Sequence, residues 1–401
     1  MITDEIKCKE SWLDFLAYKI KFNHINKYEE KEISDFVNEE KYLIYYNQII
    51  EGVFPGDFPK KILISKEASE KKRIVYSFNH DENIILKYIA HCLSIYDYIF
   101  SPVCYSFRRN YGIKNVVNHF KNNLSYTEKY CFKGDLHNYF NSIDVNILLD
   151  KLDFLKNDDL PVYNIFKKIL SANSVYYNGQ LIDDSHGAMA GIPVSPFFAN
   201  LYLTELDNYF YNKHIEYFRY SDDILIFAPT ENLLKEYTSY FFNSIKELKL
   251  KINPDKAAFF SPGDNFEFLG FSYNKGTIDI SANTLRKVKV KIKRKANALR
   301  KWQRAKNLTP ENAAVGFIRS MNKKFFGKED YDDFSWNRWF FPNITTDHSL
   351  KIIDAYMQEY IRYIFTGRHY KGNYRISYEY LKSLDYRSLV NEYYKFKEKN
   401  I

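Results

Sequence analysis

Two adjacent carboxylates stand out in the sequence because of their surroundings. Asp222 and Asp223 interrupt the aromatic and aliphatic stretch "EYFRYSDDILIFAP" at residues 216–229. Carboxylates in such a setting are costly to bury without a partner. If the segment "CFKGD", which ends on Asp135, forms a strand beside this stretch, a third carboxylate reaches the same edge. Three converging carboxylates repel one another and stay ionised only with bound cations.

The chemistry that fits these three carboxylates is phosphoryl transfer assisted by two metal ions. Two divalent ions about 3.5–4 Å apart serve the attacking oxygen and the leaving group of an in-line displacement. Hard oxygen ligands and substrate phosphates favour Mg²⁺, with Mn²⁺ as a substitute. Asp is common at turns, so an Asp pair there more often has only a structural role. The prediction therefore depends on the neighbouring elements.

The segments between the carboxylates have helical patterns. "SIDVNILLDKLDFL" follows the strand at 128–135 and is predicted to be a helix with Ser142 or Asp144 as its N-cap. "SPFFANLYLTELDNYF" is predicted to be a second helix, with Ser195 as N-cap and Pro196 at the first helical position. These helices would connect two neighbouring strands.

The elements around the aspartate pair predict an α+β sheet. Residues 216–229 form two short apolar arms around a tight turn, which indicates a β-hairpin with the carboxylates at its turn. An amphipathic helix over 234–248 and the strand "LKINP" follow. Nearer the N-terminus, residues 1–50 and 83–99 are predicted to be helical and residues 62–78 to be a strand pair. The resulting order places helices on one face of a sheet.

The composition describes a folded, basic protein. Of the 401 residues, 45% are hydrophobic and 18% aromatic, which excludes a disordered chain. The net charge of +8 favours a polyanionic partner. Four scattered cysteines predict free thiols in a reducing compartment. The charged N-terminus and the lack of a long apolar run predict a cytoplasmic protein without a membrane partner.

Several stretches resemble, in the same order, the motifs of reverse transcriptases. "RYSDDILIF" resembles their Y-x-D-D hairpin, and "FKGDLHNYFNSID" resembles their first catalytic-aspartate motif. "HGAMAGIPVSPFFANLYL" is similar to the glycine loop and helix between the two. "LKLKINPDKAAFF" and "FEFLGFSY" resemble the downstream motifs, and "ILISKEASEKKRIVYSF" and "CYSFRRNYGIKNVV" resemble the finger motifs. The resemblance covers about residues 55–275.

The resemblance implies an α+β right-hand polymerase with fingers, palm and thumb, whose thumb and C-terminal region are mostly helical. We expect an N-terminal helical extension over residues 1–54 and the fingers and palm over 55–275. A basic helical thumb and C-terminal region would follow over 276–401. Six aromatic residues of this region are expected to be helical core rather than a surface on which bases stack, namely Trp336, Trp339, Tyr356, Tyr360, Tyr363 and Tyr370.

The resemblance also assigns the chemistry. Asp135, Asp222 and Asp223 match the family's catalytic aspartates, which bind two Mg²⁺ ions. Lys256 matches the lysine that protonates the pyrophosphate leaving group. Nucleotidyl transfer, by an RNA-directed DNA polymerase, is the reaction that this set implies.

A second group of residues matches positions around the incoming nucleotide. Arg73 corresponds to the arginine that grips the triphosphate, and Lys66 or Lys61 would give a second contact. Phe140 corresponds to the steric gate, whose ring leaves no room for a 2′-hydroxyl. Tyr220 would hold the hairpin against the nascent strand, and Ala190 and Gly191 lie in the glycine loop. Ala190 departs from the family pattern, which has glutamine there.

A third group is expected to touch nucleic acid. Phe268, Leu269 and Gly270 match the primer grip, and Arg108 and Arg109 are candidates for the template backbone. Residues 286–306 carry eleven Lys and Arg and no acidic residue, and their phosphate binding would be independent of sequence. The residues of this segment expected to bind nucleic acid are Lys291, Lys293, Arg294 and Lys295.

The resemblance is greatest to the stand-alone bacterial enzymes. No companion nuclease or integrase domain is recognisable after residue 280, and a retron-type thumb signature is absent. Defence-associated reverse transcriptases therefore match best, which implies a structured non-coding RNA as template or scaffold, dNTPs, a cDNA product and a role against phage. A retron-type enzyme making RNA-linked DNA, a catalytically idle RNA-binding scaffold and an RNA-copying RNA polymerase remain alternatives. The priming mode and the oligomeric state stay open.

Overall fold

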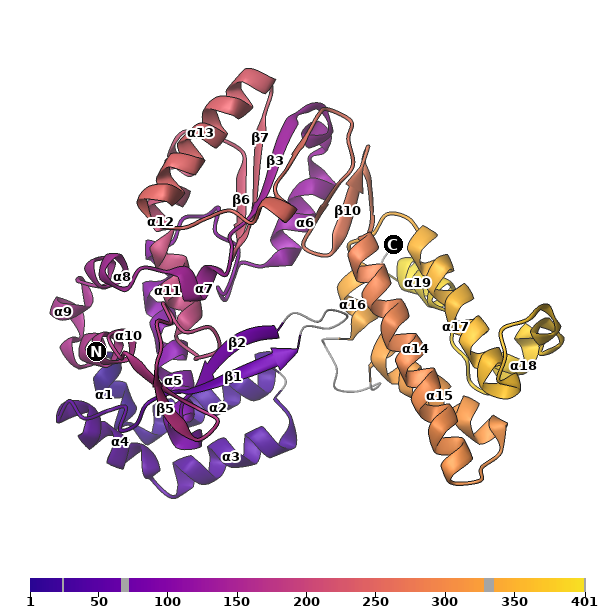
Figure 1. Cartoon of the computed structure of the whole chain (residues 1–401), viewed down its shortest axis with the longest axis horizontal. Coiled ribbons are helices and arrows are strands. Elements are labelled where there is room, and N and C mark those ends of the chain that lie inside the picture. The colour runs from indigo at the N-terminus through magenta and orange to yellow at the C-terminus, as the bar shows by residue number, and fades with distance from the viewer. Residues whose placement is uncertain (24, 66–71, 328–334, 400–401) are drawn as a thin grey trace. The chain divides into compact units, whose positions relative to one another are not determined.

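The computed structural model describes residues 1–23, 25–65, 72–327 and 335–399 (Figure 1). The chain divides into two units. The first unit consists of Met1–His119 and Glu128–Pro262, and the second of Phe120–Thr127 and Gly263–Ile401. Residues 266–275, which the sequence places with the palm, thus belong to the same unit as the C-terminal helices.

Four helices at the N-terminus pack around a buried tryptophan. The Trp12 ring stacks on Tyr88, with centroids 4.0 Å apart, and neither side chain is exposed to solvent. Burying such large rings contributes much of the stability of this region. The prediction that residues 1–50 are helical is confirmed, and the helices are α1 (Ile2–Ile6), α2 (Lys9–Asn23), α3 (Lys27–Asn38) and α4 (Lys41–Ile50).

A four-stranded sheet carries the predicted strand pair. Strands β1 (Lys60–Ser65) and β2 (Lys72–Ser77) are antiparallel, and Leu63 faces Ile74. The sheet order is β2-β1-β4-β5, with β4 at Ser174–Tyr177 and β5 at Gln180–Asp183. Helix α5 (His80–Cys92) follows and starts earlier than predicted, because the N-cap Asn79 accepts a hydrogen bond from the Glu82 amide. Its continuation, η1 (Leu93–Ile99), is a 3₁₀ helix.

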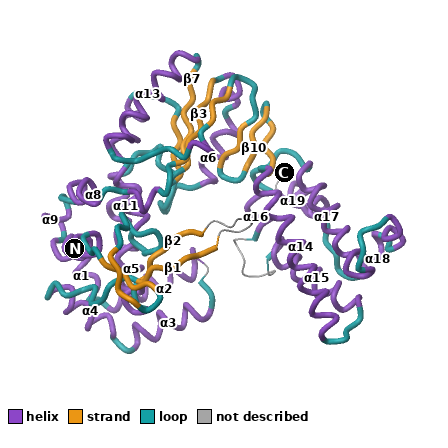
Figure 2. Tube along the Cα trace, viewed as in Figure 1, coloured by secondary structure: helices purple, strands orange, loops and turns teal. Residues whose placement is uncertain are grey.

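A second four-stranded sheet positions the carboxylates. Its order is β6-β7-β3-β8, and all neighbours are antiparallel. Figure 2 shows β7 and β3 side by side. Helix α13 (Glu231–Glu247), predicted from its apolar face, contacts β3 and β7. The predicted hairpin and the strand that ends on Asp135 are confirmed. The four strands are β3 (Tyr130–Asp135), β6 (Tyr217–Tyr220), β7 (Asp223–Ala228) and β8 (Ala258–Phe260).

The predicted strand "LKINP" is wrong. Ile252 makes one isolated bridge with Leu136, and the 3₁₀ helix η3 (Pro254–Lys256) begins directly afterwards. The Asn253 side chain accepts a hydrogen bond from the Asp255 amide, and Pro254 has no amide proton to give to a sheet. The strand that pairs with β3 is therefore the later β8.

The helix predicted after β3 is shorter than expected. The Asp144 carboxylate accepts hydrogen bonds from the Asn146 and Ile147 amides, so Asp144 and not Ser142 is the N-cap. The helix stops at Lys151, and separate helices follow. This region contains α7 (Tyr139–Ser142), α8 (Val145–Lys151), α9 (Leu155–Asp158) and α10 (Leu160–Leu170).

The assignment of Ser195 as an N-cap is also wrong. Ser195 is the first residue of α11 (Ser195–Tyr202), and its hydroxyl donates to the carbonyls of Ala188 and Met189. The side chain thus fixes the glycine loop to the helix. The predicted helix is interrupted at Leu203 and resumes as α12 (Thr204–Asn212).

The second unit is mostly helical, as predicted, with one small sheet. Strands β9 (Phe266–Phe268), β10 (Phe271–Asn274) and β11 (Thr277–Ile280) have the order β11-β10-β9. The long helix α14 (Ala282–Ala305) packs against α15 and α17. The remaining helices are α15 (Pro310–Phe326), α16 (Trp336–Phe340), α17 (His348–Thr366), η4 (Lys371–Arg375), α18 (Tyr378–Ser383) and α19 (Leu389–Lys399).

The two short elements α6 (Ile113–Asn122) and η2 (Leu124–Glu128) precede β3. Within the described ranges, no helix is both long and apolar enough to span a bilayer. The predicted α+β fold class is confirmed by these elements.

Candidate active site

The structure brings the three predicted aspartates together. Asp135 ends β3 and lies directly opposite Asp223, the first residue of β7. The Leu136 amide donates to the Asp222 carbonyl at 3.0 Å, which fixes the hairpin turn against the end of β3. Asp135 is only 4% exposed, and Asp222 and Asp223 are half-buried. The three carboxylates thus share one edge of the sheet.

The turn that carries Asp222 is strained. Ser221 is buried and has a φ of +59°, in the left-handed region that residues other than glycine, asparagine and aspartate rarely adopt. Such strain persists only where the surroundings fix the conformation, and it is concentrated at functional sites. The conformation at Ser221 sets the direction in which the hairpin presents Asp222.

The electrostatics of the site favour a bound cation. Burial, followed by the charge of Asp135, raises the pKa of Asp222 above its ordinary value. Burial, followed by the charges of Asp222 and Asp135, raises the pKa of Asp223 to about 6. Both shifts show that negative charge is costly here, and a divalent cation would remove that cost. The residues therefore fit Mg²⁺.

Lys256 supplies a cation from the chain itself. Its Nζ lies 2.5 Å from Asp135 Oδ2, although the side chain is 55% exposed. The Asn253 amide donates to the Asp135 carbonyl at 2.7 Å, so the segment before Lys256 is fixed to β3. In the described part of the chain, no three Asp, Glu, His or Cys side chains are gathered closely enough to hold a metal ion as they stand, so binding of Mg²⁺ would require the side chains of Asp135, Asp222 and Asp223 to turn toward one another. The ion pair of Lys256 with Asp135 is the interaction that neutralises this carboxylate.

The predicted steric gate is held by the glycine loop. Phe140 lies in α7, and its carbonyl accepts a hydrogen bond from the Ala188 amide at 2.8 Å. A Cβ on Gly187 would lie 2.7 Å from that carbonyl oxygen, so only glycine fits there. The half-buried Phe140 ring contacts the Phe107 ring edge to face, with centroids 6.1 Å apart. The centroid of the Phe107 ring lies 6.3 Å from that of Tyr220 in the hairpin. These rings link the gate to the aspartate turn.

The glycine loop is fixed at Ala190 by hydrogen bonds of its backbone. The Ala190 amide donates to Asn141 Oδ1 at 3.0 Å, and the Ala190 carbonyl accepts from the Tyr76 amide at 2.7 Å. A Cβ on Gly191 would lie 2.9 Å from the Tyr76 carbonyl. Asn141 and the close approach of the loop to β2 were not predicted from the sequence.

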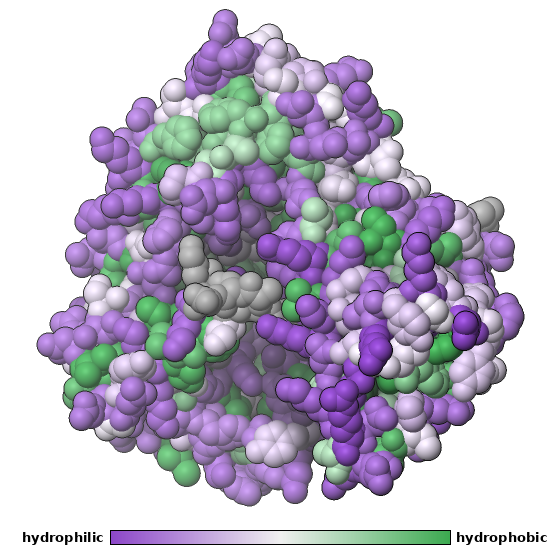
Figure 3. Space-filling view, turned by 45° about the vertical axis from the view of Figure 1, so that its right-hand side comes forward, coloured by the Kyte–Doolittle hydropathy of each residue, from purple (hydrophilic) through white to green (hydrophobic). Residues whose placement is uncertain are grey.

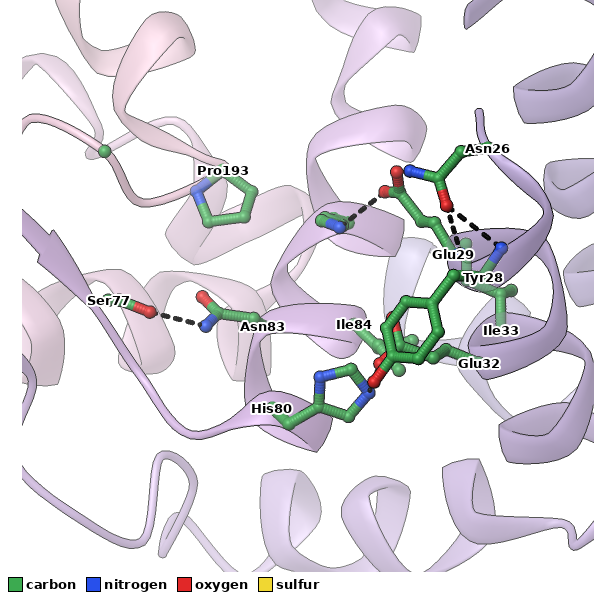
Figure 4. Close-up of a pocket in the computed structure, with 12 residues that line it drawn as sticks. Asn26, Tyr28, Glu29, Glu32, Ile33, Ser77, His80, Asn83, Ile84 and Pro193 are labelled. Atoms are coloured by element: carbon green, nitrogen blue, oxygen red, sulfur yellow. Dashed lines mark hydrogen bonds and ion pairs between the residues drawn. The ribbon is translucent and has the colours of Figure 1, made fainter. Parts of the chain in front are cut away.

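A hollow of about 400 Å³ lies beside this loop, with Gly191 in its wall (Figure 4). Its polar side chains are paired with one another. Lys87 Nζ lies 2.7 Å from Glu29 Oε1, and His80 Nε2 lies 3.5 Å from Glu32 Oε1. These pairs join α3 to α5, so the hollow is better explained as a packing seam than as a nucleotide site.

The other residues expected around the incoming nucleotide lie in different settings. Arg73 is exposed on β2, opposite Ile64. Lys66 lies outside the described residues. Its alternative, Lys61, is bound to Asp184, with Nζ 2.8 Å from Oδ1. Tyr220 is half-buried at the end of β6, next to the aspartate turn.

The prediction that Arg108 contacts the template is wrong. Its side chain is 4% exposed, and Nε lies 2.8 Å from Asp97 Oδ1. It also donates to the carbonyls of Ser101 and Cys104. Arg108 therefore stabilises the loop before α6. Arg109 is exposed, but its Nη2 donates to the His91 carbonyl at 2.8 Å.

A buried ion pair beneath the hairpin was missed in the sequence. Arg219 of β6 and Asp207 of α12 are both fully buried, and the guanidinium binds both carboxylate oxygens, with Nε 2.8 Å from Oδ1 and Nη2 2.5 Å from Oδ2. The Tyr217 hydroxyl donates to the same carboxylate at 3.1 Å. This pair ties the strand that leads into the aspartate turn to α12. The sequence offered one signal for this pair. Arg219 lies two residues after Tyr217 in a short apolar strand, so both side chains point to the same face.

The predicted primer grip belongs to the second unit. Phe268 is buried in its core, and Leu269 and Gly270 form the β9–β10 turn with φ values of +52° and +90°. The Gly270 carbonyl accepts a hydrogen bond from the Ser281 amide at 2.9 Å, which fixes the turn to the start of α14. The backbone of this turn, rather than the Phe268 ring, is what a ligand could meet.

The basic segment, residues 286–306, lies almost wholly within α14. Val288, Ile292 and Ala296 are buried at a spacing of four residues, so the remaining faces carry the charge. Lys293 and Arg294 are exposed, whereas Lys291 and Lys295 are half-buried. Figure 3 shows strongly hydrophilic surface over this part of the second unit.

Comparison with known proteins identifies the class. The model of the family "Reverse transcriptase (RNA-dependent DNA polymerase)" matches residues 64–273, just over half of the chain. The chain therefore belongs to the reverse transcriptase family. This confirms the predicted family, the right-hand polymerase fold and, at the level of the family, the predicted enzyme class.

Particular relatives are distant. The chain is 26% identical over 179 residues to the group II intron-encoded protein LtrA of Lactococcus lactis, a match covering 44% of this chain and 29% of LtrA. It is 30% identical over 119 residues to the putative COX1/OXI3 intron 2 protein of Saccharomyces cerevisiae, covering 30% of this chain and 14% of that protein. Less than a third of each relative is therefore matched. Among solved structures, apo telomerase from Candida tropicalis aligns with a TM-score of 0.45 at 11% identity, over 83% of this chain and 69% of that chain.

Proposed function

We propose that the protein is an RNA-directed DNA polymerase that copies an associated non-coding RNA into cDNA in bacterial antiphage defence. The observation that carries the polymerase proposal is the placement of Asp135 directly opposite Asp223, with Asp222 at the adjoining turn, in a chain of the reverse transcriptase family. The fixed gate segment at Phe140 supports it, because the family's sugar selection occurs there. The bacterial cytoplasm, where dNTPs and RNA are available, is the proposed setting.

The chain's own residues would divide the reaction among them. Asp135, Asp222 and Asp223 would hold two Mg²⁺ ions, which supply charge neutralisation for in-line displacement at the α-phosphate. Arg73 would bind the triphosphate through its planar guanidinium. Lys256 would give a proton to the departing pyrophosphate, since its ammonium already lies at the carboxylate edge.

Selection of the substrate would depend on Phe140. The glycine loop holds the Phe140 backbone, through the Ala188 amide and the close approach of Gly187, and so would place the ring beside the sugar of an incoming nucleotide. This favours dNTPs over NTPs and argues against the RNA polymerase alternative.

The RNA partner is proposed from charge. The face of α14 that carries Lys293 and Arg294 suits phosphates of a duplex or of a structured RNA. The defence role comes from the resemblance to stand-alone bacterial enzymes and from no feature of the site.

The function can be tested in cells carrying the gene. Nucleic acid that co-purifies with wild-type protein should contain one enriched RNA and DNA complementary to it, and phage plating should be reduced. Both effects should vanish with Asp222→Asn/Asp223→Asn, while RNA binding remains. Protection that survives this substitution would support the idle scaffold instead, and DNA covalently joined to RNA would support the retron-type alternative. Absence of complementary DNA from wild-type cells during infection would contradict the proposal.

A further inference from the structure

The second unit contains a cavity that has no part in the chemistry described above. Its volume is about 600 Å³, and it lies where α17 and η4 meet α14. Aromatic and cationic side chains dominate its wall. The lining residues used below are Lys289, Tyr356, Arg362, Tyr370, Asn373 and Tyr374.

Two tyrosines offer exposed rings at this cavity. Tyr370 is 56% exposed and Tyr374 is 75% exposed, against the sequence-based expectation that the aromatic residues here are core. Tyr360 does follow that expectation and is buried. The Tyr370 ring lies against Gly372, where a Cβ would be only 2.3 Å from the ring. The Arg362 guanidinium lies 5.2 Å from the centre of the Tyr374 ring. Both rings are therefore supported on one side and accessible.

A buried acceptor lies between these tyrosines in the chain. Asn373 is 5% exposed, and its Nδ2 donates to the Arg368 carbonyl at 2.7 Å. Its Oδ1 is buried and has no hydrogen-bond partner. An unpaired buried acceptor is costly, because it has lost water and gained nothing in exchange. A ligand that brings an N–H group into the cavity would remove that cost.

The charge around the cavity is positive. Lys289 and Arg362 line it together with the exposed Lys371. Glu359 also lines it, but its carboxylate lies 2.7 Å from His369 Nδ1. Lys289 Nζ lies 5.4 Å from the centre of the Tyr356 ring, so cation and aromatic surface are adjacent. Such a combination suits an anion that carries a flat ring.

We propose that this cavity binds an unpaired nucleotide of a single-stranded nucleic acid. The base stacks on Tyr370 or Tyr374, its N–H edge donates to Asn373 Oδ1, and its phosphates meet Lys289 and Lys371, while Arg362 supports the Tyr374 ring from within. A duplex does not fit this chemistry, since its base faces are stacked and its N–H edges are paired. The site is separate from the three aspartates and goes beyond the polymerase function. RNA and single-stranded DNA share the required chemistry.

Fluorescence anisotropy with labelled 12-nucleotide probes tests the proposal on the full chain. The probes are a single-stranded RNA, a DNA of the same sequence, an abasic single strand and a blunt duplex. Tyr370→Ala/Tyr374→Ala should weaken binding of the RNA, the DNA or both by at least about tenfold, the loss typical of base stacking on an aromatic ring. The affinities of this double alanine variant for the abasic strand and for the duplex should stay within about twofold of wild type, because its phosphate contacts are unchanged.

Two variants control for indirect effects. Tyr370→Phe/Tyr374→Phe keeps the rings and should bind like wild type. Tyr98→Ala removes a tyrosine of similar exposure (77%) in the first unit and should also bind like wild type. Equal losses for single-stranded, abasic and duplex probes would overturn the proposal, and so would unchanged single-strand affinity in the alanine variant. Should the alanine variant fail to fold, photocrosslinking of wild-type protein with 4-thiouridine RNA decides. Crosslinks within residues 368–375 support the site, and crosslinks found only elsewhere overturn it.

Discussion

Lys256 Nζ lies 2.5 Å from Asp135 Oδ2, so the lysine expected to protonate the leaving group is also the ion partner of a proposed metal ligand. An ammonium and a divalent cation would compete for the same carboxylate. The two roles of Lys256, as acid and as counter-ion, therefore have opposite consequences when the charge is removed.

The substitution Lys256→Gln separates these roles. We expect the maximal rate of dNTP incorporation to fall by about 10²-fold, the size typical of a lost general acid. We expect the Mg²⁺ concentration that gives half-maximal activity to fall, because the competing ammonium is gone. Titration of activity with Mg²⁺ measures both quantities. Lys249→Gln, which removes an exposed lysine paired with Asp144, is the matched control and should change neither. A higher Mg²⁺ requirement in Lys256→Gln would contradict the competition.

Phe140 should control the choice of sugar. Phe140→Ala is expected to lower the preference for dNTPs over NTPs by at least about tenfold, which corresponds to about 1.4 kcal/mol. The reason is steric. The substitution removes the ring that would meet a 2′-hydroxyl, while the glycine loop still holds the backbone at residue 140. Single-nucleotide incorporation with paired dNTP and NTP substrates measures the ratio. Phe259→Ala, at an exposed phenylalanine of β8, should leave it unchanged. An unchanged ratio in Phe140→Ala would assign the ring to packing alone.

The buried pair of Arg219 and Asp207 should be essential for stability. Asp207→Asn leaves a fully buried guanidinium without its counter-charge, so we expect the free energy of unfolding to fall by about 3–5 kcal/mol. Asp207→Leu/Arg219→Met removes both charges and should recover most of this loss. Denaturant unfolding of the single and double variants measures the difference. A single variant as stable as wild type would contradict the importance of this pair.

The stability should also depend on pH through His91. Burial, followed by the charges of Arg109 and Lys19, lowers the pKa of His91 to about 4. The unfolded chain binds a proton below about pH 6.5, whereas the folded chain does so only near pH 4, so stability falls as the pH decreases through this window. Between pH 7 and pH 5 we expect a loss of about 1–2 kcal/mol that is absent in His91→Gln. His214→Gln, at an exposed histidine, should keep the full pH dependence. An identical pH profile in His91→Gln would contradict this assignment.

The strands that carry the aspartates were predictable because their signals are local. The short apolar run that ends on Asp135 and the two apolar arms around Ser221 and Asp222 are local strand signals. The pairing of Asp135 with Asp223 then follows from both ends meeting at one sheet edge. The roles proposed for these residues stay predictions, whereas the family and the fold class are confirmed.

Two of the errors arise because a side chain finds hydrogen-bond partners in a neighbouring loop, whereas the strand "LKINP" fails because of Asn253 and Pro254 within it. Ser195 has the sequence of an N-cap, but the Ala188 and Met189 carbonyls take its hydroxyl. Arg108 looked like a surface charge, yet Asp97 and two backbone carbonyls bury it. None of these partners can be identified from the local pattern.

Incorporation of a labelled dNTP on an RNA template with a DNA primer tests the central claim most directly. Wild-type protein should extend the primer with Mg²⁺ and stop when EDTA removes the metal. Asp222→Asn/Asp223→Asn should reduce extension at least about 10³-fold, since the charges proposed to bind the metal are lost. Asp150→Asn, at an exposed aspartate of α8, should extend like wild type. Extension by the double variant at the wild-type rate would show that these aspartates are not the catalytic site.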